Sequence, residues 1–245
     1  MKLAIIDGRM DLNMEKKLIQ DGFIVIRTIE HPNLQDPVKY HPDMQMSRID
    51  CRTLVICPIL YDYYYRVIKS VNNNINLVKG STYLEENYPM NIAYNAVILN
   101  ESIIHLSGYT DVMILDEIKK RKMNYLSVRQ GYTKCSVMIM PDGHCITGDD
   151  GIYKKMTKEN LHIDKTEIKD IELKGYDYGF IGGCSSIGDE KLYITGRLKE
   201  HKYGIELENK LKSKNINVVE LSDSPLKDYG TIIILGDNNE SDSIK

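Results

Sequence analysis

Three side chains in this sequence are of types that together support covalent catalysis. His41 and Asp43 lie in the segment HPDMQMSRID, and Cys135 lies in YTKCSVMIM. A cysteine becomes a nucleophile when a nearby base or cation populates its thiolate. A histidine can give and take protons near neutral pH, and a carboxylate can hold the imidazole or bind a cationic substrate. These residue types predict a thiol active site, provided that the fold brings them together.

Each of these residues also has a purely structural interpretation. A lone cysteine in an apolar run is more often a small core residue than a nucleophile, and His-Pro-Asp is a common turn sequence. His31-Pro32 fits that turn interpretation. Cys184 is the main competitor for the nucleophile, because the run IGGCSS resembles an exposed loop. The residues alone leave these alternatives open.

A repeated pattern of elements is what would position the candidate residues. Short β-rich runs recur roughly every 40 to 50 residues, each followed by a helix-like stretch, a second β-rich run and a closing segment. The opening runs are residues 3–6, 53–57, 102–106, 144–147 and 192–195, and the helices are 12–20, 62–71, 111–122, 152–160 and 199–214. The second runs begin at Phe23, Ile75, Asn124, Glu167 and Ile216, and the closing segments at His41, Asn91, Tyr132, Tyr178 and Asp228.

This repeat predicts an α/β ring. One unit cannot bury both a helix face and a sheet face, but five units in a ring can, with sheets inside and helices outside. An open α/β sheet is the alternative, although the fourth element of each unit does not fit a plain βαβ repeat. We expect residues 1–237 to form a single domain and the polar residues 238–245 to be a disordered tail.

In a closed ring the closing segments meet near the axis, so their polar side chains are the candidate site. The fourth segment is rich in glycine between Gly179 and Gly183. The other segments supply His41, Asp43, Asn91, Asn95, Cys135 and Asp228.

The composition argues against several classes of protein. The formal net charge is −3, so we expect no nucleic-acid partner. No apolar run approaches the roughly 20 residues that a membrane-spanning helix needs. The first residues do not resemble a signal peptide, and the odd number of cysteines, 5, argues against a disulfide framework. We therefore expect a cytoplasmic protein that does not associate with a membrane.

No motif indicates a cofactor or a metal. The sequence has no CxxC pair, and its histidines lack zinc-site spacing. Asp149-Asp150-Gly151 is interpreted as a turn and helix cap rather than a metal site. The glycines from Gly179 to Gly183 are a weak phosphate signal, because no helix clearly follows them. A single glycine in Ile6–Met10 makes an open nucleotide-binding domain the weakest alternative.

The repeat and the motifs together resemble the guanidino-group modifying enzymes of the pentein fold. That family consists of five-bladed propellers of ββαβ units and includes arginine deiminases, dimethylargininases and amidinotransferases. HPDMQMSRID resembles its His-x-Asp strand, and GYTKCSVMI resembles its cysteine strand, two units later as in the family. The family's other acidic residues would fall in the fourth and fifth units, as a circular variant that a ring tolerates. The sequence also resembles a bacterial branch of this fold whose substrate is undefined.

The resemblance implies roles for individual residues. Cys135 would attack an amidino carbon, His41 would protonate the leaving amine and then activate water, and Asp43 would bind the guanidinium group. Asp228, in KDYG, loosely matches a family glutamate that is followed by two glycines. The family's Phe-x-Arg-Asp segment is absent at residues 178–184, and Asp177 could replace its carboxylate.

The expected activity is cysteine-dependent hydrolysis or amidino transfer on a small guanidine, amidine or related C–N substrate. It would proceed through a covalent thiol intermediate, without a cofactor. We expect Asn91 and Asn95 to contribute to substrate binding. The alternative is a pentein-fold binding protein that has no catalytic function.

Overall fold

The structure is a computed structural model that describes residues 1–236 of the 245-residue chain. The predicted disordered tail, residues 238–245, lies outside this described part, as does residue 237. Within residues 1–236 the strands form five three-stranded sheets. The predicted α/β class is therefore confirmed.

All five sheets follow one plan, in which the central strand has an antiparallel neighbour on one side and a parallel neighbour on the other. The central strands are β1 (Leu3–Ile6), β4 (Thr53–Ile56), β7 (Ser102–His105), β10 (Cys145–Thr147) and β13 (Lys191–Ile194). Their parallel neighbours are β2 (Ile24–Arg27), β5 (Asn76–Lys79), β8 (Asn124–Ser127), β11 (Ile163–Lys165) and β14 (Asn217–Glu220). Their antiparallel neighbours are β15 (Ile233–Leu235), β3 (Met46–Arg48), β6 (Val97–Ile98), β9 (Val137–Ile139) and β12 (Ser185–Gly188).

A helix links each pair of parallel strands, because parallel strands need a long crossover connection. These helices are α1 (Leu12–Gln20), α3 (Tyr61–Val71), α4 (Val112–Lys120), α6 (Asp150–Lys158) and α7 (Gly204–Ser213), the last preceded by the 3₁₀ turn η1 (Leu198–Glu200). Asp11, Asp111 and Asp149 cap α1, α4 and α6 by accepting hydrogen bonds from backbone amides of the first turn. Asp149 is thus the helix cap that its sequence predicts.

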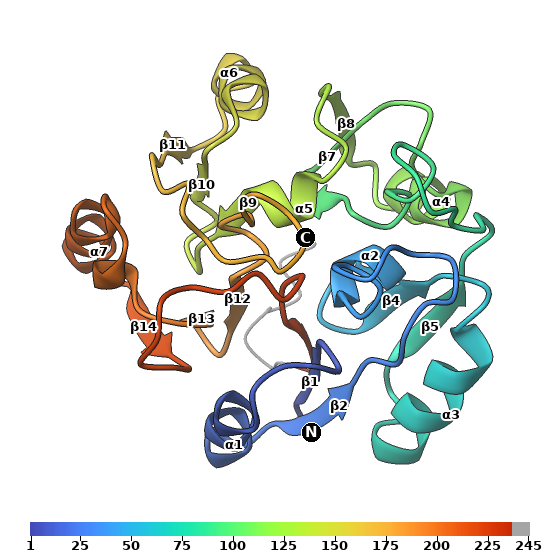
Figure 1. Cartoon of the computed structure of the whole chain (residues 1–245). Helices are drawn as coiled ribbons and strands as arrows, with labels where there is room; N and C mark the ends of the chain where they lie inside the picture. Colours follow the sequence, from blue (N-terminus) through green and yellow to red (C-terminus); the bar gives the residue numbers. More distant parts are fainter. Residues whose placement is uncertain (237–245) are drawn as a thin grey trace.

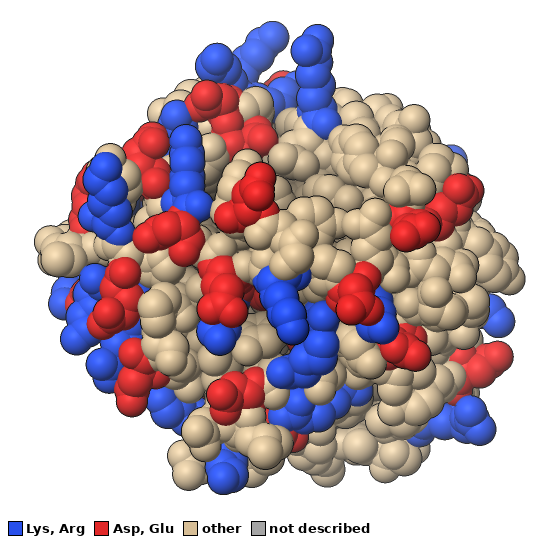
Figure 2. Space-filling model, in the orientation of Figure 1, with Lys and Arg blue, Asp and Glu red and all other residues tan. Residues whose placement is uncertain are grey.

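The five crossover helices lie on the outside of the molecule, and the sheets are arranged around its centre (Figure 1). Apolar side chains between each helix and its sheet form the core. In the first unit, for example, Met14 and Leu18 of α1 pack with Ala4 and Ile6 of β1. On the face shown in Figure 2, acidic and basic side chains are interspersed rather than gathered in separate patches. No helix within residues 1–236 is both long enough and apolar enough to cross a membrane.

Two sequence predictions about the elements are wrong. The strand expected from Glu167 lies earlier, at β11 (Ile163–Lys165), because the chain pairs with β10 soon after α6 ends. Ile168 and Ile171 pack instead into a hydrophobic cluster from an irregular segment.

The closing segments that carry His41 and Cys135 also do not begin as strands. Each begins with a single helical turn, α2 (Pro42–Gln45) and α5 (Thr133–Ser136), and only then continues into β3 or β9. Both turns lie nearer the centre of the molecule than the crossover helices do (Figure 1).

Candidate thiol site

The candidate residues lie on the segments that lead into the antiparallel edge strands. His41 precedes α2 and Asp43 is within it, and Cys135 lies in α5. Asn95 comes two residues before β6, and Asp228 comes shortly before β15. The repeat thus brings residues from four units together, although turns rather than strands present them.

The sulfur of Cys135 lies in a polar environment. Its thiol donates a hydrogen bond to Asp43 Oδ2 at 3.1 Å, and Asn95 Nδ2 donates to the sulfur at 3.0 Å. Asn95 also binds the backbone on both sides: its Oδ1 accepts from the amides of Lys134 and Cys135 at 3.0 and 3.3 Å, and its Nδ2 donates to the Asp43 carbonyl at 3.3 Å. Asn95 therefore fixes α5 against α2 and holds the thiol beside the carboxylate.

His41 lies between two buried carboxylates. Its Nε2 is 3.8 Å from Asp7 Oδ2, and its Nδ1 is 3.9 Å from Asp228 Oδ1, which are ion-pair distances but too long for hydrogen bonds. The side chains of His41 and Asp43 are 1% and 2% exposed. Within residues 1–236, neither ring nitrogen of His41 nor Oδ1 of Asp43 has a hydrogen-bond partner. Three buried polar atoms are thus unpaired, which is rare in folded proteins. Of these, Oδ1 of Asp43 belongs to the carboxylate that contacts the thiol.

The glycine-rich fourth segment holds Asp228 in place. Asp228 accepts hydrogen bonds from the amides of Phe180 and Gly230 at 2.8 and 2.9 Å. A Cβ on Gly183 would lie 2.0 Å from Asp228 Oδ1, so only glycine fits there. The Gly183 amide also donates to the Cys135 carbonyl at 3.0 Å. These glycines allow close backbone approach to the site, which explains them without a phosphate.

Burial sets the ionisation of the site. It raises the pKa of Asp43 to about 6, against an opposing effect of the Lys134 charge, and it also raises the pKa of Asp228. Burial and then the charges of Asp43 and Asp228 raise the pKa of the Cys135 thiol well above its usual value. Burial lowers the pKa of His41 although Asp228 and Asp7 oppose the shift. The site therefore holds a protonated thiol and a neutral imidazole. The negative charges of its carboxylates are not fully balanced by nearby positive charges, so the site favours a bound cation.

Within residues 1–236, two of the predicted substrate-binding residues, Asn91 and Asp177, make no hydrogen bond with the thiol. Asn91 accepts a hydrogen bond from Tyr132 at 3.1 Å and donates to the Glu86 carbonyl at 3.2 Å, so both ends of its amide are occupied. Asp177 is exposed at the surface, so its carboxylate does not replace the missing family residue in the buried cluster. Asn95 is in the site, where it contacts the thiol rather than open space.

Cys184 does not match the exposed loop thiol that its sequence suggests. It is 0% exposed, packs in a hydrophobic cluster, and donates to the Phe180 carbonyl at 3.2 Å. Burial raises its pKa well above the usual value. Within residues 1–236, no group of three or more His, Cys, Asp or Glu side chains is arranged to hold a metal ion.

Sequence reasoning missed three charged residues of the site. Asp7 follows the buried strand β1 and is bound by Arg9, whose Nη2 and Nε lie 2.8 and 3.1 Å from its two oxygens. Lys134 directs its ammonium group to Thr231 Oγ1 at 3.0 Å. The sequence offered two signals for these residues. One is an aspartate directly after a fully apolar strand, and the other is a lysine adjacent to the candidate nucleophile.

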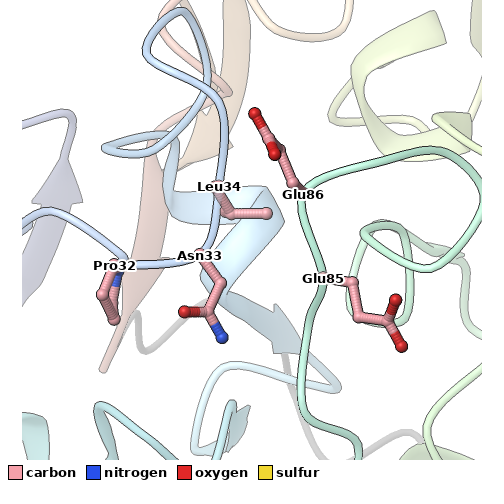
Figure 3. A pocket seen from close by; sticks show the side chains of 5 residues that line it. All are labelled: Pro32, Asn33, Leu34, Glu85 and Glu86. Carbon is pink, nitrogen blue, oxygen red and sulfur yellow. The ribbon is translucent and has the colours of Figure 1, made fainter.

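A surface hollow lies between the loop that precedes α2 and the loop that precedes β6 (Figure 3). It is lined by Pro32, Asn33, Leu34, Glu85 and Glu86. The two loops are joined by a hydrogen bond from Asn33 Nδ2 to the Leu84 carbonyl at 3.1 Å. None of the candidate catalytic side chains lines the hollow.

Comparisons with solved structures define the fold. The chain is similar to DDAH (dimethylarginine dimethylaminohydrolase) from Pseudomonas aeruginosa, solved with citrulline, at a TM-score of 0.56 and 8% identity over 90% of this chain and 91% of that one. It is similar to inosamine-phosphate amidinotransferase from Streptomyces griseus, at a TM-score of 0.54 and 10% identity over 92% and 78% of the chains. For the amidinotransferase SxtG from Microseira wollei the TM-score is 0.52, with 9% identity over 90% and 88%.

The protein therefore has a pentein, amidinotransferase-like fold, as its sequence motifs suggested. Within that fold it belongs to a family of unknown function, DUF6873, whose model matches residues 5–233. No curated protein matches the sequence.

Proposed function

We propose that this protein is a cysteine-dependent enzyme that cleaves or transfers a C–N bond of a guanidine, amidine or related small molecule. The observation that supports it most is the contact between the thiol of Cys135 and the buried carboxylate of Asp43, whose other oxygen has no hydrogen-bond partner within residues 1–236. Unpaired buried groups are costly unless a ligand completes them. We also propose that the five sheets are the blades of one closed α/β propeller, whose axis passes near this cluster.

The charges of the site favour a planar cation as substrate. Asp43 and Asp228 are both buried, and burial raises the pKa of each carboxyl more than the charges of Lys134 and His41 lower it. A guanidinium or amidinium group supplies one positive charge and several N–H donors in a plane, which suits paired carboxylates. Oδ1 of Asp43, which lacks a partner within residues 1–236, is positioned to accept one of those donors.

The reaction would proceed in two balanced stages. The Cys135 sulfur donates an electron pair to the central carbon, and the C–N bond to the leaving group breaks with its electrons going to nitrogen. The thiol proton departs with that nitrogen, through His41. A water molecule, deprotonated by the neutral imidazole, then attacks the carbon and expels the thiolate, which recovers a proton. If an amine takes the place of water, the same site performs amidino transfer.

Replacing the sulfur tests this proposal directly. Cys135→Ala should abolish turnover of candidate guanidines, amidines and amides, and should abolish covalent labelling by a haloacetamidine, both followed by mass spectrometry. Cys184→Ala is the matched control, because it removes a fully buried thiol that packs in a hydrophobic cluster and donates to a backbone carbonyl, and it should leave labelling at Cys135 intact. Labelling that persists in Cys135→Ala and is lost in Cys184→Ala would reject the assignment.

One observation favours the alternative of a binding protein without catalysis. Cys135 is only 4% exposed and its thiol is held protonated, so a ligand could occupy the carboxylates without being attacked. Calorimetric binding of a guanidinium compound to the native chain, with no mass change in ligand or protein, would support this alternative over the enzyme.

A further inference from the structure

We propose, resting on the function above, that Asp43 is the first acceptor of the Cys135 proton and that Lys134 supplies the positive charge that holds the resulting thiolate. The only hydrogen bond that the thiol donates within residues 1–236 goes to Asp43 Oδ2, at 3.1 Å. The ring nitrogens of His41 make no hydrogen bond there, so the imidazole is not the immediate partner of the sulfur. The proton therefore has a path to a carboxylate that is already in contact.

This step conserves the charge of the site. The S–H bond breaks with its electron pair remaining on sulfur, and the proton forms an O–H bond with Oδ2 of Asp43. A thiol and a carboxylate become a thiolate and a carboxylic acid, and the proton later leaves with the departing nitrogen. Burial of Asp43, which raises its pKa to about 6, makes this carboxyl a better proton acceptor than an exposed aspartate.

The thiolate then needs compensating donors and charge. Asn95 Nδ2 already donates to the sulfur at 3.0 Å, which favours the anion. Lys134 directly precedes Cys135 in α5, and its charge acts on Cys135, Asp43 and Asp228. The other charged groups that act on this cluster are His41, Asp7 and Arg48, the last on β3. With Lys134 neutralised, the thiolate would face two acidic side chains.

The backbone around Lys134 is built to hold its ammonium group. Nζ donates to Thr231 Oγ1 at 3.0 Å and lies 3.5 Å from the Gly182 carbonyl. Thr231 has a φ of 66°, which is rare for a β-branched residue and indicates a strained backbone that packing enforces. Its hydroxyl in turn donates to the Ser185 carbonyl at 2.6 Å. A strained residue that positions a buried cation beside a thiol suggests a functional role for the cation.

The test is the pH profile of iodoacetamide alkylation at Cys135, read by peptide mass spectrometry in the full chain. Lys134→Met should slow alkylation about tenfold or more at pH 8 and shift the profile to higher pH, since tenfold corresponds to about one pKa unit. Lys134→Arg, which keeps the charge, should restore the rate to within about threefold. Lys165→Met makes the same change of net charge at an exposed ion pair with Asp150 and should have no effect.

Two further variants separate the outcomes. Transfer of the proton within the thiol–carboxylate pair does not depend on pH, so it should give the native protein a level alkylation rate above about pH 6. Asp43→Asn should replace this plateau by a rate that rises about tenfold per pH unit, whereas Asp36→Asn, at an exposed carboxylate, should keep the plateau. Should Lys134→Met fail to fold, Thr231→Val, which removes the acceptor of the ammonium group, should still slow alkylation. An unchanged profile in Lys134→Met, or a plateau that persists in Asp43→Asn, overturns the proposal. Because iodoacetamide needs no guanidine recognition, these results are independent of whether the proposed substrate class is correct.

Discussion

Burial and charge oppose each other at every residue of the candidate site. The side chains of Asp43, His41 and Cys135 are each at most 4% exposed, and burial disfavours the charged form of all three. A ligand cation would relieve this conflict, because it compensates the carboxylates without exposing them. We therefore expect the residues that favour ligand binding to reduce the stability of the free protein.

Asp43→Asn should make the free protein more stable at neutral pH. Burial raises the folded-state pKa of Asp43 from 3.8 to about 6, so between these values the folded protein binds more protons than the unfolded chain does. Stability from this group is present below about pH 4 and is lost as the pH rises through about 6, by about 3 kcal/mol in total. The variant should recover about 1–2 kcal/mol at pH 7, since asparagine keeps part of the hydrogen bonding.

Urea unfolding of both proteins from pH 4 to pH 8 measures this difference. Asp36→Asn is the control. Lys39 lowers the pKa of that exposed carboxylate, so any effect of its titration on stability lies below pH 4. If the wild-type protein is more stable than Asp43→Asn at pH 7, nearby positive charges balance the Asp43 carboxylate and the prediction is wrong.

Arg9→Met should raise the pKa of His41. The guanidinium group of Arg9 binds both oxygens of Asp7, and Asp7 lies 3.8 Å from His41 Nε2. The Arg9 charge lowers the pKa of the imidazole, so its removal lets Asp7 stabilise the protonated ring more strongly. Nuclear magnetic resonance titration of the His41 ring checks the direction. Arg66→Met, at an exposed position on α3, should leave the titration unchanged.

The chemistry-bearing residue types could be recognised from the sequence, but their partners could not. Cys135, His41 and Asp43 stand out because their types combine into a known mechanism. Lys134 and Asp7 do not, because surface ion pairs and active sites use the same residues, and only packing decides which charges are buried. Asp177 was misjudged for the same reason: its carboxylate is exposed.

At the scale of elements, the turn that leads into β15 organises the site. Within four residues, this turn makes three contacts with the site. Asp228 lies at ion-pair distance from His41, Gly230 binds α2, and Thr231 accepts a hydrogen bond from Lys134. The Gly230 carbonyl accepts a hydrogen bond from the Asp43 amide at 3.2 Å. One short segment of the fifth unit thus fixes residues of the first and third units.

Gly230→Ala should destabilise the protein and displace the imidazole. Gly230 has a φ of 63°, and a Cβ there would lie 2.3 Å from the His41 Cβ. We expect a loss of about 3 kcal/mol or more, because a clash is added to the backbone penalty. Gly108 is the matched control: its φ is 86°, but a Cβ would meet nothing within 4 Å, so Gly108→Ala should cost only about 1–2 kcal/mol. Equal losses in urea unfolding would contradict the predicted clash.

The positions of most elements could be predicted because their patterns are local. The run Leu3–Ile6 is a fully buried strand, and residues 12–20 form α1 with the expected bounds. The helical turns α2 and α5 could not be predicted, because a four-residue helix has no periodicity to detect. Asp43 and Cys135 lie in those turns, and His41 directly precedes α2. The least predictable elements are therefore the ones that present the candidate catalytic residues.

At the scale of the whole molecule, the two ends of the described chain meet in one sheet. β15 pairs with β1 in antiparallel register, Leu3 opposite Leu235 and Ile5 opposite Ile233. Each other sheet likewise takes its antiparallel edge strand from the preceding unit. The sequence predicted five repeats, but it did not show that each closing segment joins the next sheet, because strand pairing between units is not a local property.

A circular permutant should fold if this pairing, rather than the order of the chain, defines the structure. We propose to join residue 245 to residue 1 and to open the chain between Asp142 and Gly143, in an exposed turn between β9 and β10. Gly236 lies against the Met1 carbonyl, so the two ends of the described chain are close enough to be joined by a short loop. We expect one cooperative urea transition, within about 2 kcal/mol of the native chain, and retained reactivity at Cys135.

A second permutant, opened between Asn95 and Ala96, provides the comparison. It keeps the same joined ends but cuts the segment through which Asn95 contacts Cys135 and Lys134. It should lose stability and the Cys135 reactivity profile together, because the site and the packing of α5 depend on that segment. If both permutants unfold in several steps, the pairing of β1 with β15 does not couple the units into one cooperative ring. If the second permutant is as stable and as reactive as the first, Asn95 does not hold the thiol in place.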